Sequence, residues 1–506
     1  MSSFTVSRKN ISGLATSGNT IASVAEQENF TPNLPEFLNE QDPVKAIRYF
    51  LAEFNHNILI KTSDDIVNCI YKSIANIDQL INKQVNEIIH HPTFQKLESS
   101  WRGVKFLCEQ KKQSSNVKIR ILDISWPELS KDINHALEFD QSQIFQKVYS
   151  DEYGIAGGEP FGVLLGDYEI SHKISDTHRN DDILTLAGMS EIAAASFSPF
   201  ITGVSNELFG LNNFSELGLP LNLQTIFKQN EYIRWNQLRE KLDTRFIGLT
   251  VPRMLARIPY NTKNGYAKNL YFKEITSKSD NSDSLWMNAC YGFGSVLIRE
   301  FTNVGWFGHI RGVLRDKISG GLVETTTIDF FQADKNNIWH KPITDVVITD
   351  KLERELSDLG FIPLCQCYDN PNVAFYNNQS IHKPNNSKDE LKNSNAKLSV
   401  MLQHILCGSR IAHYIKIIFR DKIGSSQSTQ SIEQYMQKWL HKYTTGRDDL
   451  EWEEQARYPL REAHVKVKEH PIKPGQYICI ITIKPHYQLD QMVSELELAT
   501  ELLEIG

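Results

Sequence analysis

The chain has 506 residues, of which 41% are apolar and 23% charged, and its net charge at pH 7 is −7. This composition is ordinary for a globular protein with a sizeable core, and the length favours about three domains. The dispersed negative charge argues against a general nucleic-acid surface, which would need a basic face. The longest apolar run, residues 192–204, is too short to span a bilayer, so we expect no membrane insertion.

The cysteines and the amino-terminal residues bear on the compartment. Seven cysteines are scattered along the chain, an odd number that favours a reducing setting. Basic residues at 8 and 9 are followed by a stretch broken by Ser, Thr, Asn and Gly, which does not form the apolar region of a signal peptide. We therefore expect a cytoplasmic protein.

The first 90 residues are predicted to form a loose arm and two helices. Residues 1–35 are poor in large apolar side chains, and this arm cannot fold alone. Within it, residues 20–25, with Ile21 and Val24, favour a strand only if a partner sheet receives them; otherwise the arm is a disordered tail. Residues 42–90 have apolar residues at helical spacing, which either pack on the chain's own core or hold a partner.

A third helix is predicted over residues 91–109, opened by Pro92. Its expected buried face comprises Phe94, Leu97, Trp101, Val104 and Leu107. Residues 116–123 are predicted to form a strand. A glycine pair at 157–158 resembles a phosphate loop, but it precedes a strand instead of following one and no GK[ST] follows, so we reject that interpretation.

Helices and strands alternate through the rest of the chain. Helices are predicted at 183–204, 234–242, 285–304, 398–421 and 431–443, strands at 248–254, 306–313 and 361–366, and a strand running into a helix at 343–359. This alternation predicts a mixed α/β or α+β architecture.

The carboxyl-terminal region contains the most informative strand pattern. Residues 463–468 alternate between apolar and polar side chains, which predicts a strand with one wet face. Residues 476–484 are apolar on both faces, so this strand needs cover and a hydrogen-bonded neighbour on each side, and Pro485 ends it. One neighbour is residues 463–468; the other is either another segment of this chain or a strand from another chain. Residues 488–505 suit a helix or a strand equally.

No catalytic constellation is evident. Cys365 and Cys367 form a lone CxC that suits core packing, and His404 with Cys407 do not close a zinc site. Residues 167–182 are rich in Asp, Glu and His, which suits a metal site or a solvated loop. A metal- or thiol-dependent enzyme therefore stays as an alternative hypothesis.

Several motifs occur together in the order of one known family. They are HPTFQKLESSWRGVKFL, EYGIAGGEPFGVLLGDYE, LWMNACYGFG, GWFGHIRGV, LGFIPL, SIHKP and PGQYICIITIKPHYQLD, between residue 91 and the carboxyl terminus. The set resembles the large subunit of the type VI secretion contractile sheath, the TssC/VipB family, and is most similar to its IglB branch. Two departures are Phe197, where the family commonly has histidine, and residues 314–319, which precede a glycine pair where the family often has a compact glycine run directly after IRGV.

The resemblance implies a structural protein without enzymatic activity or cofactors in the bacterial cytoplasm. It implies an arm and partner-binding helix at 1–60, an α/β sheath body at 61–397, and an inner domain at 398–506 whose hairpin is completed by strands of neighbouring chains. The implied partners are a small sheath subunit (TssB/VipA/IglA-like), further copies in a helical polymer, an inner tube, a baseplate and an AAA+ disassembly ATPase. A phage-tail-like injection device is the alternative.

The resemblance also assigns roles to individual residues. The strand-exchange set is Ile21, Val24, Val465, Val467, Ile478, Ile480 and Thr482, and the acidic candidates to face the tube are Asp490, Glu495, Glu497, Glu501 and Glu504. The motif residues expected to be structural are Trp101, Arg102, Gly103, Gly157, Gly158, Glu159, Pro160, Asp167, Trp306, Arg311, Gly312, Pro485 and His486.

Overall fold

The computed structural model describes residues 34–54, 62–111, 116–153, 155, 157–260, 272–275, 284–313, 317–324, 330–332, 338–367, 372–384, 393, 396–397, 399–423, 429–447, 450, 452–469, 477–485 and 496–502. The chain divides into two compact units, residues 1–91 with 260–275, and residues 92–259 with 276–506. Within the described part of the chain, no helix is long and apolar enough to cross a membrane.

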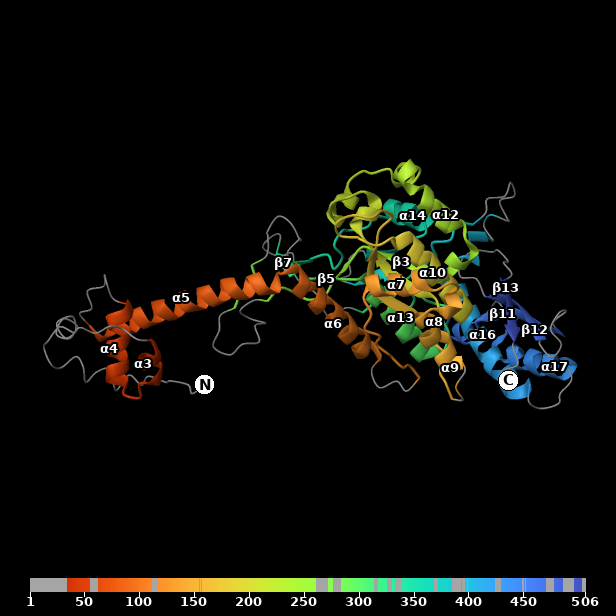
Figure 1. Cartoon of the computed structure of the whole chain (residues 1–506), viewed down its shortest axis with the longest axis horizontal. Helices are drawn as coiled ribbons and strands as arrows, with labels where there is room; N and C mark the ends of the chain where they lie inside the picture. Colours follow the sequence, from red (N-terminus) through yellow and green to blue (C-terminus); the bar gives the residue numbers. More distant parts are fainter. Residues whose placement is uncertain are drawn as a thin grey trace. The chain divides into compact units, whose positions relative to one another are not determined.

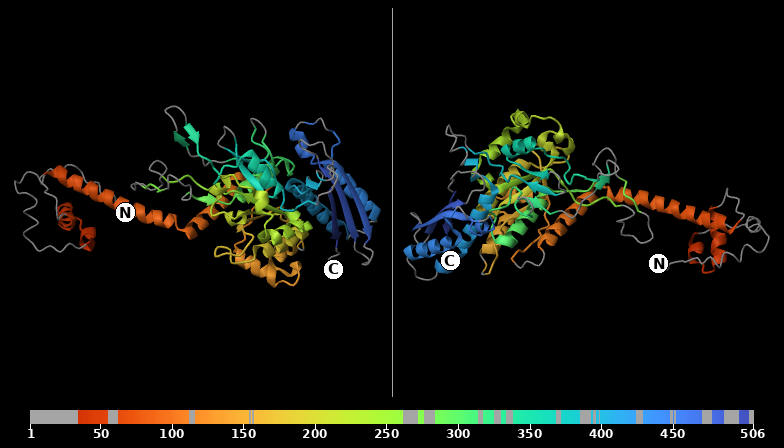
Figure 2. Two further views of the ribbon diagram at one scale, coloured as in Figure 1. Left: turned by 90° about the horizontal axis from the view of Figure 1, so that it is seen from above. Right: turned by 180° about the vertical axis from the view of Figure 1, so that it is seen from behind.

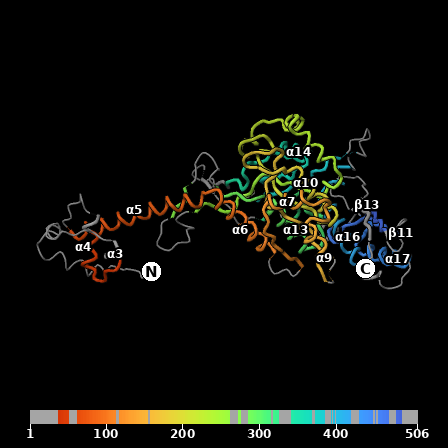
Figure 3. Tube along the Cα trace, in the orientation of Figure 1, coloured from red at the N-terminus to blue at the C-terminus, as the bar shows by residue number. Residues whose placement is uncertain are grey.

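The first unit is helical. It contains α3 (Leu34–Asn39), α4 (Pro43–Phe54) and α5 (Ser63–Ile89), the last an uninterrupted helix of 27 residues (Figure 3). A capping box starts α5: the Asp65 N–H donates to Thr62 Oγ1 at 3.3 Å, and the Thr62 N–H donates to Asp65 Oδ2 at 2.9 Å. These helices confirm the two predicted over residues 42–90.

The apolar side chains of α5 are buried near its two ends and exposed along its middle in the part of this unit that the structure describes; Cys69 and Ile89 are buried. Ile66 is buried and packs with Ile47, Phe50 and Ile70. Further along, the stripe is exposed at Ile74, Ile77, Leu80, Ile81 and Ile88. An exposed apolar stripe of this length is typical of a surface that a partner covers.

A six-stranded sheet forms the centre of the second unit. Its strands are β1 (Leu164–Ile170), β2 (Phe200–Val204), β3 (Ile247–Val251), β9 (Ile362–Gln366), β10 (Val373–Phe375) and β6 (Leu322–Val323), hydrogen-bonded in the order β1-β2-β3-β9-β10-β6. The first four are parallel, whereas β10 runs antiparallel to β9 and β6. The predicted mixed α/β class is confirmed.

Helices cover both faces of this sheet (Figure 1). On one face, α13 (Ala289–Val304) and α6 (Pro92–Lys111) share a core with Ile201, Ile362 and Leu364. On the other, α10 (Asp182–Ser196) and α12 (Ile233–Glu240) share a core with Phe200, Phe361 and Cys365. Because neighbouring strand residues point to opposite faces, these apolar runs fill both cores at once.

The remaining elements of the body are short. The helices are α7 (Trp126–His135), α8 (Gln143–Phe145), the π-turn η2 (Gln146–Ser150), α9 (Asp151–Tyr153), α11 (Leu223–Ile226) and α14 (Asp350–Asp358), with 3-10 turns η1 (Phe139–Gln141), η3 (Asn206–Phe209), η4 (Phe214–Gly218), η5 (Asn230–Tyr232) and η6 (Leu242–Phe246). Two small antiparallel pairs join β4 (Met254–Leu255) to β5 (Trp286–Met287) and β7 (Phe330–Gln332) to β8 (Ile338–His340).

Several sequence predictions for the body are wrong. The helix predicted over residues 183–204 ends at Ser196, where Phe197 adopts a left-handed φ of 53°, and Phe200–Val204 form the strand β2. The strand predicted at the start of residues 343–359 is also wrong, since this stretch forms bends with an isolated bridge at Thr344 before α14.

Residues 306–313 form turns instead of a strand, because Gly312 adopts φ +69° and closes a bend. Residues 116–124 are extended but pair with no strand of the sheet. On α6 the buried residues are Gly103 and Leu107, while Phe94, Leu97 and Trp101 are exposed, since the helix packs on α13 through its glycine face.

The carboxyl-terminal part combines helices with a separate sheet (Figures 1 and 2). Its helices are α16 (Leu402–Ile423), α17 (Thr429–Leu440), the 3-10 turn η8 (His441–Tyr443) and α18 (Trp452–Arg457). The strands β11 (Leu460–Glu469), β12 (Tyr477–Pro485) and β13 (Leu496–Leu502) form an antiparallel sheet in that order. Both predicted hairpin strands are confirmed, and the ambiguous end of the chain contains a strand.

Candidate assembly interface

The central strand of the carboxyl-terminal sheet, β12, has both neighbours within its own chain. Ile480 pairs with Lys466 of β11 on one side and with Ala499 of β13 on the other. The prediction that another chain supplies the second neighbour of this strand is therefore wrong for this structure. The reason is local: residues 496–502 alternate as a strand does and are long enough to complete the ladder.

One face of this sheet is packed and the other is largely open. Val465, Val467, Cys479, Ile481 and Ile483 are buried in a core with α16 and α17. The opposite face consists of exposed His464, Lys466 and Lys468 and half-buried Ile478, Ile480 and Thr482. The cover expected over both faces of β12 is thus present on one face only, among the residues described.

The outer edge of β11 is closed by side chains of α17. Gln437 Nε2 donates to the Ala463 carbonyl at 2.7 Å, and Gln437 Oε1 accepts from the Val465 N–H at 3.0 Å. One helical turn earlier, Glu433 Oε2 accepts from the Val467 N–H at 3.0 Å. These three bonds satisfy backbone groups that a further strand would otherwise use, which is a recognised way of protecting a sheet edge.

The other edge of the sheet is formed by β13, and no described strand pairs beyond it. The predicted exchange residues Val465, Val467, Ile478, Ile480 and Thr482 all lie in this sheet. Of the acidic candidates, Glu497 and Glu501 lie in β13, opposite Thr482 and Ile478. The others lie outside the described residues, as do the arm residues: Ile21, Val24, Asp490, Glu495 and Glu504.

The WRG motif holds α6 against the body. Arg102 and Arg257 both reach the Glu98 carboxylate, with Nε–Oε1 distances of 2.7 and 2.8 Å. Burial raises the pKa of Glu98, but the two guanidinium groups outweigh it and the net shift is downward. A Cβ on Gly103 would collide with the ring of Tyr291, so this position requires glycine. Trp101 lies 63% exposed.

The GGEP motif forms a tight turn held by a neighbouring acid. Gly157 adopts φ +85°, and a Cβ on Gly158 would collide with the Glu152 carbonyl. The Glu152 carboxylate accepts from the Glu159 N–H at 2.8 Å and pairs with Arg120. Pro160 follows the turn and is half-buried. This motif is therefore a structural corner in the described chain.

The remaining motif residues also lie in packed positions. Asp167 accepts a hydrogen bond from Ser100 of α6. Trp306 is buried and packs edge-on against Tyr414 and Tyr443, at 6.4 and 5.1 Å between ring centroids. The Gly312 N–H donates to the Phe375 carbonyl at 2.9 Å. Arg311 is half-buried beside Gly312, Pro485 ends β12, and His486 lies outside the described residues.

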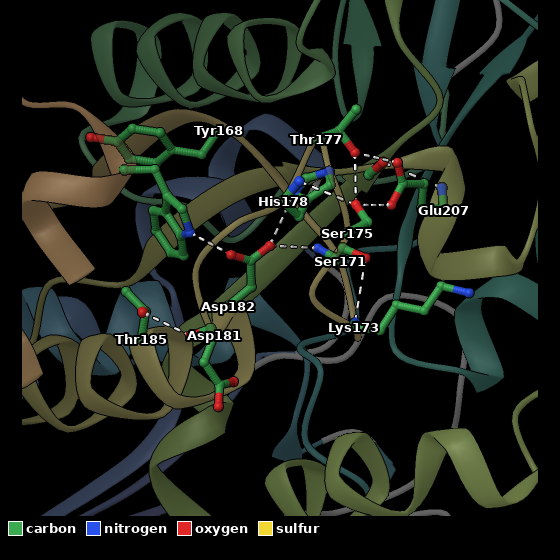
Figure 4. Close-up of polar contacts among 12 residues, drawn as sticks. Tyr168, Ser171, Lys173, Ser175, Thr177, His178, Asp181, Asp182, Thr185 and Glu207 are labelled. Carbon is green, nitrogen blue, oxygen red and sulfur yellow. Dashed lines mark hydrogen bonds and ion pairs between the residues drawn. The ribbon is translucent and has the colours of Figure 1, made fainter. Parts of the chain in front are cut away.

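The acidic stretch 167–182 forms a hydrogen-bond network instead of a metal cluster (Figure 4). Asp182 accepts from Trp126 Nε1 at 2.7 Å and from the Ser171 N–H at 2.9 Å, and its Oδ2 lies 3.1 Å from His178 Nδ1. The bond to Asp182 raises the pKa of His178. Within the described ranges, no group of three His, Cys, Asp or Glu residues is placed to hold a metal ion.

The thiol candidates are packing residues. Cys365 is buried in the core that includes α10 and α12, and Cys367 is half-buried directly after β9. Burial raises the pKa of both thiols, which disfavours the reactive thiolate. Burial likewise lowers the pKa of His404 to about 3 and raises that of Cys407 to about 12.

Comparison with known proteins identifies the family of this chain. Residues 71–382 match the model of the EvpB/VC_A0108 tail sheath N-terminal domain, and residues 391–502 match the tail sheath gpW/gp25-like domain of the same family. The chain belongs to this tail sheath family. The sheath chain is also 38% identical over 471 residues to the type VI secretion system sheath protein TssC1 of Pseudomonas aeruginosa, covering 92% of this chain and 93% of that protein. It is therefore a structural subunit of a type VI secretion contractile sheath.

Sequence reasoning missed Glu433 and Gln437, the residues of the sheath subunit that close the β11 edge. They are separated by one turn of α17 and lie beside the buried face formed by Ile432, Met436 and Leu440. A polar i, i+4 pair bordering an apolar stripe is a weak signal, because solvated helix faces show the same pattern.

Proposed function

We propose that this sheath subunit pairs one-to-one with a small sheath subunit and that the heterodimers polymerise helically around an inner tube in the bacterial cytoplasm. Contraction of this polymer would drive the tube outward from a baseplate, and an AAA+ ATPase would recycle the contracted form. The proposal includes no enzymatic step, and its main support is the sheath family match over two consecutive regions of the chain.

The carboxyl-terminal sheet supports a specific mode of linkage between subunits. Since Gln437 and Glu433 occupy the β11 edge, a strand from a neighbouring chain would add beyond β13. The proposed donor is the arm around Ile21 and Val24. Backbone ladders of this kind hold neighbours together while rigid bodies rotate between two packings.

Two further contacts belong to the proposal. The exposed apolar stripe of α5 offers the small subunit an interface of the helix-in-groove type. The acidic residues at and around β13, including Glu497 and Glu501, would face the tube.

Co-expression with the small subunit, followed by electron microscopy, tests the proposal. We expect hollow rods of stacked rings. Isolated particles that bind the small subunit yet never form rods at high concentration would refute it. A gene neighbourhood containing capsid genes would favour a phage-tail-like device instead, and stoichiometric metal in the purified protein would revive the enzyme hypothesis.

A further inference from the structure

One buried carboxyl group of the sheath subunit has no partner in the described part of the chain. Glu300 lies near the end of α13 and is 3% exposed. Its Oε1 is buried without a hydrogen bond, and no ion pair joins the carboxyl group to another described residue. An ionised carboxylate that loses its hydration on burial needs such a partner. The position therefore favours the protonated form of Glu300.

The neighbouring cation is held by other groups. The Arg299 guanidinium donates hydrogen bonds to the carbonyl groups of Gly320 and Leu322 instead of pairing with Glu300. Burial raises the pKa of Glu300 to about 7, and the opposing effect of the Arg299 charge is smaller. The carboxyl group therefore keeps its proton at mildly acidic pH and loses it near neutral pH.

The helix α16 packs beside this carboxyl group. α13 belongs to the region that matches the tail sheath N-terminal domain, and α16 belongs to the region that matches the gpW/gp25-like domain. Both helices contribute to one apolar core, and the Arg410 guanidinium lies 4.8 Å from the ring centroid of Phe301. Burial raises the pKa of the Cys407 thiol, and the charge of Glu300 adds to this shift. Glu300 thus lies at the contact between the body and the carboxyl-terminal part of the subunit, here called the α13–α16 contact.

Few other groups at the α13–α16 contact change their charge near neutral pH. Burial raises the pKa of Cys407 to about 12 and lowers that of His404 to about 3, so both stay neutral between pH 5 and 8. Arginine side chains keep their charge throughout this range. The ionisable residues on the described elements around Glu300 are Arg299 on α13, His309 and Arg311 in the turn that follows, Glu324 after β6, and His404, Cys407 and Arg410 on α16.

We propose that Glu300 makes the α13–α16 contact depend on pH, because its protonated form holds the carboxyl-terminal part against the body and its ionised form loosens that contact. The carboxylate regains its hydration only when the two helices separate. The closed contact binds the proton more tightly than an open one, in which the pKa returns to 4.5. The contact is therefore firm at acidic pH, weakens as the pH rises from about 4.5 to 7, and changes little above that.

Hydrogen exchange at pH 5 and pH 8, corrected for the intrinsic pH dependence of amide exchange, tests the proposal. A separated α16 would fray, because isolated helices are marginally stable in water. Amides of residues 402–411 in the wild type are expected to be at least tenfold better protected at pH 5, and the pKa shift of Glu300 limits the effect to about 300-fold. An equal gain in β2 and β3 would overturn the proposal, because it would indicate a change in the whole body.

Variants of Glu300 provide the decisive comparison. Glu300→Gln has no proton to lose, so residues 402–411 should show the same protection at pH 5 and pH 8. Glu300→Met, which is apolar and similar in size, should behave in the same way and serves if Glu300→Gln does not fold. If either folded variant keeps the pH dependence of the wild type, the inference is wrong.

Two control variants separate Glu300 from other titrating groups. Burial also raises the pKa of Glu353 on α14, but its Oε1 accepts a hydrogen bond from Ser357 Oγ at 3.0 Å, and α14 borders a different core. Glu353→Gln should therefore keep the pH dependence of residues 402–411. His309 is buried in the turn after α13, and histidine ordinarily titrates near pH 6.5. His309→Gln should also keep the effect; its loss in this variant would assign the effect to the imidazole and refute the proposal.

Discussion

Replacing Gln437 by alanine tests the closure of the β11 edge. The side chain makes two hydrogen bonds to the strand, to the Ala463 carbonyl and from the Val465 N–H. Each contributes about 0.5–1.5 kcal/mol net, so Gln437→Ala is expected to lower the free energy of unfolding by about 1–3 kcal/mol. Glutamine and alanine are both good helix formers, so helix propensity changes this value little.

Hydrogen exchange localises the effect of Gln437→Ala. The Val465 amide loses its partner and should exchange faster, whereas the Val467 amide keeps its bond to Glu433 and should remain protected. Gln434→Ala is the control, because Gln434 is an exposed glutamine of the same helix. Equal urea midpoints for the two variants, or equal loss of protection at Val465 and Val467, would refute the reasoning.

Three further predictions follow from the packing. Ile480→Pro removes an N–H from the middle strand of the carboxyl-terminal sheet and leaves a ladder acceptor unpaired, so it should cost about 1–3 kcal/mol and abolish rods; normal rods would contradict the strand assignment. Gly103→Ala drives a methyl group into the Tyr291 ring and should cost about 1–3 kcal/mol in urea unfolding, whereas Gly162→Ala, with open space around it, should be nearly neutral. Burial raises the pKa of Glu300 to about 7 from 4.5, so the stability that its protonated form contributes is lost between about pH 4.5 and pH 7, to a total of at most about 3 kcal/mol. The free energy of unfolding of the wild type should therefore fall as pH rises from 5 to 8, while that of Glu300→Gln should not. If the two proteins show the same dependence of unfolding free energy on pH, Glu300 is not its cause.

Much of the fold was predictable because the spacing of apolar residues along the sequence reflects which side chains are buried. The runs at 247–251 and 362–366 are apolar on both faces and form central strands with helices above and below. The predicted helix at 285–304 is confirmed from Ala289 onward as α13, after an Asn288 cap, whereas Trp286–Met287 at its predicted start form the strand β5. The strands at 463–468 and 476–484 are confirmed; the alternation of 463–468 matches its burial, whereas 476–484 is apolar on both faces and buried on one.

Predictions failed where the local pattern of apolar residues favours one structure and the packing between distant segments favours another. On α6, Trp101 and Leu97 have the apolar character of a core, yet the helix packs through Gly103 because close contact with Tyr291 excludes larger residues. The segment 488–505 carried no decisive period, and only pairing with β12 selects a strand. The closure of β11 depends on side-chain contacts between residues almost thirty positions apart, which single-residue preferences do not encode.

The spacing of Glu433 and Gln437 also fixes the register of the strand β11 relative to α17. Four residues of helix advance about 6 Å, close to the advance of about 6.8 Å over two residues of a strand. The two side chains therefore lie opposite alternate backbone N–H groups of β11. Over a longer helix the difference between the two advances would accumulate, and further side chains would no longer face these groups. A slip of one residue would turn the Val465 and Val467 amides away from α17 and expose the apolar side chains, so one turn of helix sets the phase of the whole sheet.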